Sequence, residues 1–234
     1  MERFPETVQD FLDGQILLIN KPLGWTSFDV VKKIKNLIRT KYNLKKLKVG
    51  HAGTLDPLAS GLLIVCTGKF TKRISELQGQ AKIYTGDITL GGTTPSYDLE
   101  TEIDNKFETN HITETLVKET TEQFIGEIEQ KPPIFSALKR GGERLYEKAR
   151  RGESFKIQAR KISVHSFDIK TIEMPKVSFE IKCSKGTYIR SIAYDFGTAL
   201  NSGAYLSKLC RTAMGDYQLV DALDVSYFEK QLNS

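Results

Sequence analysis

The chain has 234 residues, of which 39% are hydrophobic and 27% are charged, and its formal net charge is +5. This composition is typical of a globular protein and excludes a disordered or fibrous chain. The longest apolar run, Leu62 to Cys66, is far shorter than the roughly 20 residues that cross a bilayer, and the N-terminus lacks the apolar stretch of a secretory signal. We therefore expect a cytoplasmic protein with no membrane segment.

The predicted elements interleave strands and helices without a strict βαβ rhythm. Short apolar runs predict strands at 15–19 and 62–66, and hydrophobic alternation predicts a strand at 82–90 and two strands within 161–183. A further strand is predicted at 205–213. Helical spacing predicts helices from Phe28 to Ile38, capped by Thr26 or Ser27, and at 70–78, 112–125 and 187–200. This pattern favours an α+β fold with a mixed, largely antiparallel central sheet flanked by helices and loops.

Several kinds of site are not favoured by the sequence. Neither a GxGxxG nor a GxxxxGK[ST] phosphate loop is present, so dinucleotide-binding and P-loop enzymes are poorly supported. Cys66, Cys183 and Cys210 are widely separated, without a CxxC pair, so neither a disulfide framework nor a zinc site is predicted.

Positive charge is concentrated in two windows. Residues 32–48 contain eight basic residues and no acidic one. The second window, residues 131–151, has only two acidic residues, Glu143 and Glu147. Its seven basic residues are Lys131, Lys139, Arg140, Arg144, Lys148, Arg150 and Arg151. Clustered cations suit a polyanion because each neutralised phosphate releases counterions. The alternative is a solvated basic surface.

The segment VGHAGTLDPLASG, residues 49–61, is rich in glycine, alanine and serine and is predicted to be a loop. Within it, Asp56 precedes Pro57, which disfavours the helical region for the aspartate. An extended Asp56 could present its carboxylate in a cleft. The alternative is that the Asp-Pro pair only makes a turn.

GHAGTLDPLASGLL, preceded by INKPLGWTS, resembles the catalytic signature of the TruB family, the bacterial-type tRNA pseudouridine-55 synthases. Four further segments resemble later blocks of that family, in the same order: AKIYTGDITLGGTTPSYDLET, QKPPIFSALKRGGERLYEKARRG, KCSKGTYIRSIAYDFG and GAYLSKLCRTAMG. The resemblance extends from about residue 14 to residue 215. It implies a pseudouridine synthase-like fold and an enzyme that isomerises uridine to pseudouridine at position 55 in the T arm of tRNA, as a monomer and without metal or another cofactor.

The resemblance also implies catalytic residues. Asp56 matches the essential aspartate, the nucleophile or covalent participant, and Arg190 matches the arginine that pairs with it. Tyr84 matches the tyrosine that stacks on the target base and is a candidate for proton transfer. Alternatively, Tyr84 is a strand aromatic, and Arg190 caps a helix or forms a surface ion pair. Whether Asp56 attacks ribose C1′, adds to base C6 or acts as a base in an elimination stays open.

Three further residues match the substrate pocket. Tyr188 and Leu209 match pocket-lining residues, and His51 matches a histidine near the flipped nucleotide. Alternatively, Tyr188 is a helix-start aromatic, Leu209 is core, and His51 holds its loop by a hydrogen bond. Lys21 and Pro22 match a motif with a structural role, and a loop-anchoring role is expected for Asp98.

Residues about 127–153 resemble the family's thumb-like loop, which closes over the RNA stem-loop, so the cations of the second window are expected to meet its phosphates. Many members carry a C-terminal PUA-type module, whereas this sequence ends at Ser234, soon after the last block. We therefore expect a single catalytic domain over 1–234 and no PUA module. Two alternatives remain, a non-catalytic RNA-binding or RNA-folding module and a synthase that acts on another RNA.

Overall fold

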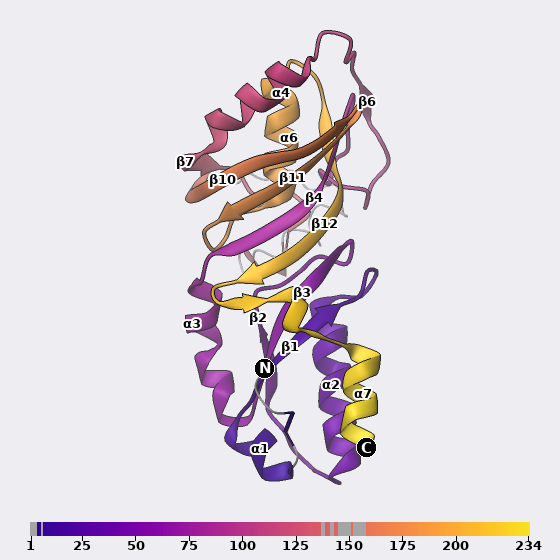
Figure 1. Cartoon of the computed structure of the whole chain (residues 1–234), viewed down its shortest axis with the longest axis vertical. Helices are drawn as coiled ribbons and strands as arrows, with labels where there is room; N and C mark the ends of the chain where they lie inside the picture. Colours follow the sequence, from indigo (N-terminus) through magenta and orange to yellow (C-terminus); the bar gives the residue numbers. More distant parts are fainter. Residues whose placement is uncertain (1–3, 6, 137–138, 141–142, 145–150, 152–157) are drawn as a thin grey trace. The chain divides into compact units, whose positions relative to one another are not determined.

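The computed structural model describes residues 4–5, 7–136, 139–140, 143–144, 151 and 158–234 (Figure 1). The chain forms two compact units, one made of Met1–Tyr84 and Cys210–Ser234 and the other of Thr85–Leu209. Strands β4 (Lys82–Leu90) and β12 (Ala204–Met214) each contribute residues to both units. Of the described helices, none is long and apolar enough to span a membrane.

The first unit has a mixed sheet with the order β14-β1-β3-β12. β1 (Ile16–Lys21) is antiparallel to β3 (Ala59–Thr67) and parallel to β14 (Leu223–Asp224). β2 (Val49–Ala52) pairs with β3, and β13 (Tyr217–Gln218) pairs with β12. The remaining elements of this unit are α1 (Val8–Asp13), α2 (Ser27–Lys41), η1 (Gly68–Arg73), α3 (Ile74–Gly79), η3 (Leu219–Asp221) and α7 (Val225–Asn233).

Helix α2 begins where the sequence predicts. Thr26 is its N-cap and forms a capping box with Asp29, which satisfies two backbone N–H groups at the helix start. The apolar face of α2 packs with α7 against β1 and β3, through Ile34, Ile38 and Phe228 among others (Figure 1). This burial on one face leaves the lysines of α2 on the other faces of the helix.

The second unit has the strand order β12-β4-β11-β10-β7. The predicted strand pair within 161–183 is the antiparallel pair β10 (Arg160–Glu173) and β11 (Lys176–Cys183), and β7 (Gly126–Gln130) lies along β10. Its core includes Phe124, Phe167, Phe179 and Phe196, whose rings contact one another at 5.3–6.2 Å between centroids.

The other elements of the second unit are short apart from one helix. They are β5 (Gly92–Thr93), β6 (Asn105–Lys106), α4 (Glu114–Thr121), η2 (Glu122–Phe124), β8 (Lys139–Arg140), β9 (Glu143–Arg144) and the longer α6 (Ile189–Ala199). Phe196 of α6 and Phe124 of η2 reach the aromatic core, so these helical segments cover the sheet. The predicted α+β class with a mixed sheet and flanking helices is confirmed.

Two sequence predictions need correction. The predicted loop at 49–61 is a loop only at 53–58, because Val49–Ala52 and Ala59–Thr67 are strands that pair with each other. The predicted helix at 70–78 is a 3-10 turn, η1, followed by the short helix α3. Of the predicted thumb-like loop at 127–153, residues 137–138, 141–142, 145–150 and 152–153 lie outside the described residues.

Candidate active site

Asp56 lies in the loop 53–58 between β2 and β3, and three backbone positions around it are held by hydrogen bonds. The N–H of Leu55 donates to Ser27 Oγ at 2.8 Å, and this hydroxyl donates to the Leu55 carbonyl at 3.1 Å. The N–H of Gly24 donates to the Pro57 carbonyl at 2.8 Å, and that of Ala59 donates to the Asp56 carbonyl at 3.0 Å. The half-buried aspartate therefore sits on a backbone that is fixed on both sides.

A buried arginine of β12 supports the same loop. Arg211 is only 1% exposed, and its guanidinium donates to the Leu62 carbonyl at 2.8 Å and to the Gly53 carbonyl at 2.9 Å. Gly61 has a φ of +102°, and a Cβ there would lie 2.4 Å from the Arg211 carbonyl oxygen, so only glycine fits. Sequence reasoning missed Arg211, although its place in the alternation between the apolar residues Leu209 and Ala213 was a usable signal of a buried cation.

Lys21 places a second buried cation near Asp56. Its ammonium donates to the carbonyls of Pro22 at 2.9 Å and Trp25 at 2.6 Å, and so holds the turn after β1. Burial lowers the pKa of Lys21 to about 8; the negative charge of Asp56 opposes this lowering, and the positive charge of Arg211 adds to it. Lys21 therefore both shapes the turn and attracts the Asp56 carboxylate.

His51 lies on β2 opposite Val65 of β3. Burial lowers its pKa, and the positive charge of Arg211 lowers it further, so the ring is neutral at pH 7. Its Nδ1 atom is buried and has no hydrogen-bond partner among the described residues. Nδ1 therefore makes no hydrogen bond to the loop within the described part of the chain.

In the second unit, Arg190 is fixed in the first turn of α6. It is 4% exposed, and its guanidinium donates to the carbonyls of Ser96 at 3.1 Å and Phe135 at 2.9 Å. Its Nε lies 3.6 Å from an Asp98 carboxylate oxygen, and both side chains are buried. The alternative of a surface ion pair is therefore wrong. The other carboxylate oxygen of Asp98 accepts the Glu100 N–H at 3.0 Å, as expected for a loop anchor.

Tyr188 is the N-cap residue of α6 and is half-buried. The side-chain amide of Gln130 accepts the Tyr188 N–H at 2.8 Å and donates to the Tyr188 carbonyl at 3.0 Å. The guanidinium of Arg160 lies 4.7 Å from the centroid of the tyrosine ring, within cation–π range. Gln130 thus positions the start of α6, a role that the sequence analysis did not find.

Tyr84 of β4 and Leu209 of β12 are both buried, at 7% and 8% exposure. Asp56, His51 and Tyr84 belong to the first unit, whereas Arg190, Tyr188 and Leu209 belong to the second. The contacts expected between these two groups, including the Asp56–Arg190 ion pair, therefore stay predictions.

Of the seven cations expected to contact the RNA backbone, Lys131 and Arg151 are described and exposed. The Ser191 hydroxyl donates to the Lys131 carbonyl at 2.8 Å, which ties this lysine's backbone to α6. Burial raises the pKa of Asp195, also on α6, to about 6, and the charge of Lys131 opposes this rise. The side chains of Lys139, Arg140, Arg144, Lys148 and Arg150 lie outside the described part of the chain.

No group of three or more histidine, cysteine, aspartate and glutamate side chains that could hold a metal ion is found among the described residues. The chemistry available in the described part of the chain is that of a carboxylate, aromatic hydroxyls, a neutral imidazole and buried guanidinium groups. Such groups can attack carbon, transfer protons and stabilise negative charge.

Comparisons with known proteins point to one family. Residues 39–189 match the family described as TruB family pseudouridylate synthase (N terminal domain). A protein of Flavobacterium johnsoniae named tRNA pseudouridine synthase B is 61% identical over 227 residues, which cover 97% of this chain and 99% of that protein. Proteins with the same name from Phocaeicola vulgatus and Bacteroides thetaiotaomicron are 50% and 49% identical, covering 96% of this chain and 95% of each.

Two solved structures extend the comparison to the fold. A chain of a Cbf5-Nop10-Gar1 complex matches 95% of this chain with a TM-score of 0.70 and 28% identity. A chain of an H/ACA RNP bound to a substrate RNA containing 2'-deoxyuridine matches 96% with a TM-score of 0.66 and 27% identity. The present chain spans 57% and 56% of the length of those two chains.

Proposed function

This chain belongs to the TruB family of pseudouridylate synthases, and we propose that it isomerises uridine to pseudouridine at position 55 in the T arm of tRNA. The main structural support is the Asp56 loop, because three separate elements hold the backbone on both sides of one carboxylate. The curated relatives named tRNA pseudouridine synthase B support tRNA as the substrate. We also propose that the protein acts in the cytoplasm as a monomer.

The reaction breaks the C1′–N1 glycosidic bond of uridine and joins C1′ to C5. The proton lost from C5 is balanced by one gained at N1, so the reaction is an isomerisation that needs no oxidant or reductant. A stacked base hides these atoms, so the enzyme must extrude the nucleotide. Stacking of the flipped base on Tyr84 would recover roughly 1–3 kcal/mol of the lost base stacking.

Asp56 acts as the nucleophile or base, and its ionised form is required for either role. Arg190 is proposed to face this carboxylate as a permanent positive charge, while its bonds to Ser96, Phe135 and Asp98 hold the guanidinium in place. His51, Tyr188 and Leu209 are proposed to line the pocket. The seven cations from Lys131 to Arg151 are proposed to contact the phosphates of the stem-loop.

The test is to incubate purified protein with a T-arm minihelix and no added cofactor, and then to map pseudouridine by mass spectrometry. We expect one modified position, 55, for the unchanged protein and none for Asp56→Asn, which should bind the RNA normally because a neutral amide of the same shape replaces the carboxylate. Normal turnover by Asp56→Asn would overturn the mechanism.

Parallel reactions distinguish the alternatives. Modification of other transcripts in preference to tRNA would identify a synthase for another RNA. Tight binding of the minihelix without conversion by the unchanged protein would identify a non-catalytic RNA-binding module.

A further inference from the structure

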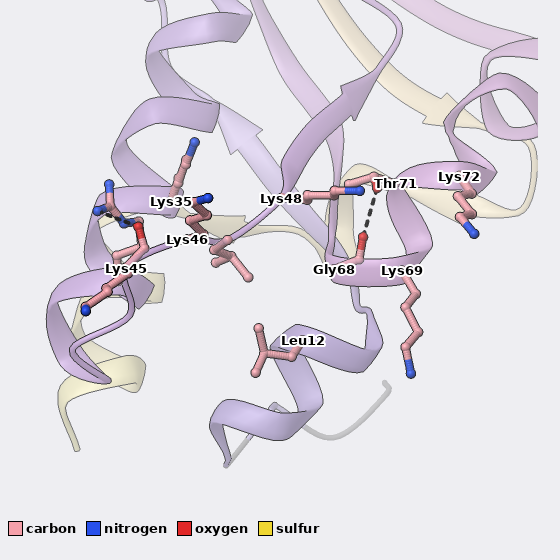
Figure 2. Close-up of a pocket in the computed structure, with 11 residues that line it drawn as sticks. Leu12, Lys35, Lys45, Lys46, Lys48, Gly68, Lys69, Thr71 and Lys72 are labelled. Atoms are coloured by element: carbon pink, nitrogen blue, oxygen red, sulfur yellow. Dashed lines mark hydrogen bonds between the residues drawn. The ribbon is translucent and has the colours of Figure 1, made fainter.

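A hollow of about 590 Å³ lies in the first unit, between the second half of α2, the segment that follows it and η1 (Figure 2). We call it the basic pocket. Seven of its lining residues are cations, namely Lys35 and Arg39 of α2, Lys45, Lys46 and Lys48 of the following segment, and Lys69 and Lys72 of η1. Figure 2 shows Lys45 and Lys46 across the hollow from Lys69 and Lys72. Cations from three elements therefore converge on one concave surface.

Most of this charge is not neutralised by the protein. Lys69 pairs with Asp13 at 2.7 Å, but no ion pair forms with Lys35, Lys45, Lys46, Lys48 or Lys72 in the described part of the chain. By contrast, Lys33 of the same helix pairs with Glu229 of α7 at 2.8 Å. Like charges that line one hollow repel one another, so this arrangement favours a bound anion.

The backbone of the pocket is fixed even though all of its lysines except Lys35 are exposed. The Arg39 guanidinium donates to the carbonyls of Leu44 and Lys45, both at 3.1 Å, and so ties the end of α2 to the following segment. Leu47 is buried in the core beneath it. The lysines thus extend from an ordered support, which preserves their spacing.

The basic pocket is remote from Asp56 within this unit. Strand β3 runs from Ala59, next to the Asp56 loop, to Thr67, next to the pocket residue Gly68. Nine strand residues at about 3.3 Å per residue place the two ends roughly 25 Å apart. An anion in the pocket therefore cannot belong to the target nucleotide, although a long polyanion could reach both places.

We propose that the basic pocket is a second RNA-binding site, which takes backbone phosphates of the tRNA outside the segment that carries the target uridine. This inference relies on the proposed tRNA substrate. No aromatic ring lines the pocket among its described residues, so base stacking is absent and recognition is electrostatic and independent of sequence. The pocket would raise the affinity for whole tRNA and leave the chemical step unchanged.

The test compares two triple variants on two RNAs. The first, Lys45→Gln/Lys46→Gln/Lys72→Gln, removes three pocket cations. The control, Lys118→Gln/Lys170→Gln/Lys230→Gln, removes the same charge from exposed lysines of α4, β10 and α7. Dissociation constants for a full-length tRNA transcript and for a T-arm minihelix are measured over a range of salt concentrations.

For the pocket variant we expect tRNA binding to weaken about tenfold or more. The slope of log K against log salt should become shallower by about 1 for each phosphate that the variant no longer neutralises. Its binding to the minihelix should be unchanged, because that RNA is too short to reach the pocket. The control should bind both RNAs nearly as the unchanged protein does.

Equal weakening on both RNAs, or no more weakening than in the control, would overturn the proposal. Binding to anionic phosphatidylserine vesicles is measured in parallel, and a pocket variant that loses vesicle binding but keeps tRNA binding would assign the site to a membrane instead. The binding measurements test the pocket, and pseudouridine formation tests the proposed function. A failure to form pseudouridine at position 55 would therefore reject the proposed function, whereas the pocket is still judged by tRNA binding.

Discussion

The Asp56 loop and the basic pocket lie at opposite ends of β3 and are built by different forces. The loop is held by short hydrogen bonds from Ser27, Gly24 and Arg211. The pocket presents mostly exposed cations, and Lys69 is the single lining residue with an ion pair in the described part of the chain. Chemistry needs a reacting group placed to within a fraction of an ångström, whereas a polyanion is attracted by charge at longer range.

This difference predicts opposite responses to substitution. Removing a polar group from the loop support leaves buried partners unsatisfied and displaces the carboxylate. Removing an exposed pocket lysine such as Lys45 or Lys46 leaves only solvated neighbours and relieves repulsion.

The largest effect is expected for Arg211→Met. The methionine fills similar space but leaves the Leu62 and Gly53 carbonyls without their donor, at a cost of about 1–3 kcal/mol for each buried group. A shift of about 1 Å in the Asp56 loop would lower the rate by roughly 10²-fold. Urea unfolding and single-turnover pseudouridine formation on the minihelix measure these two effects.

Arg39→Met is the matched control for stability. Arg39 also donates to two backbone carbonyls, those of Leu44 and Lys45, but it is only half-buried. Water can replace its bonds, so we expect a smaller loss of unfolding free energy than for Arg211→Met. Equal losses would mean that burial does not distinguish the two regions.

Ser27→Ala should have the next largest effect. It removes both hydrogen bonds to Leu55 from a hydroxyl that is 2% exposed, so we expect a loss of about 1–3 kcal/mol and a fall in rate of about tenfold. Ser202→Ala removes one comparable bond, to the Glu108 carbonyl, away from the loop. A stability loss without a rate loss in Ser27→Ala, as expected for Ser202→Ala, would show that Ser27 does not position Asp56.

Elements with a strong local signal could be predicted from the sequence. The spacing of Phe28, Val31, Ile34 and Ile38 predicted α2, and the alternation in KIYTGDITL predicted β4 with its observed bounds. Strand β2 was missed because Val49–Ala52 is short and contains glycine, and becomes a strand only by pairing with β3. Tertiary pairing here overrides a weak local preference.

The residues of the candidate site also fall into those that the sequence predicted and those that it did not. Asp56, Tyr84 and Arg190 were named because they match residues to which the resembled family gives a role. Arg211 and Gln130 were missed because each acts on the backbone of a distant residue, Gly53 and Tyr188 respectively. Side-chain hydrogen bonds to backbone groups leave no pattern in the partner's sequence, so only the structure reveals these bonds.

Lys21→Met tests the buried support of the Asp56 loop through the pH dependence of the free energy of unfolding. The folded-state pKa of Lys21, about 8, lies below its ordinary value of 10.5, so between these values the unfolded chain binds more protons than the folded one. Lys21 therefore makes the free energy of unfolding rise with pH in this window, by at most about 1.4 kcal/mol per pH unit. Below pH 8 the full penalty for burying the charge is present. Urea unfolding from pH 7 to 10.5 should show this rise in the unchanged protein and not in Lys21→Met; identical profiles would contradict the buried-cation assignment.

The smallest change in the free energy of unfolding is expected for substitutions in the basic pocket. The sign of this change distinguishes the pocket from the Asp56 loop. Lys45→Gln/Lys46→Gln removes two exposed charges that repel their neighbours, so the free energy of unfolding at low salt should stay within about 0.5 kcal/mol of the original or rise slightly. In about 1 M salt, where the Debye length is near 3 Å, the difference should vanish. Urea unfolding at the two salt concentrations checks this. A clear, salt-independent loss would mean that these lysines hold the fold by contact, as Arg211 does, and the contrast between the two ends of β3 would no longer hold.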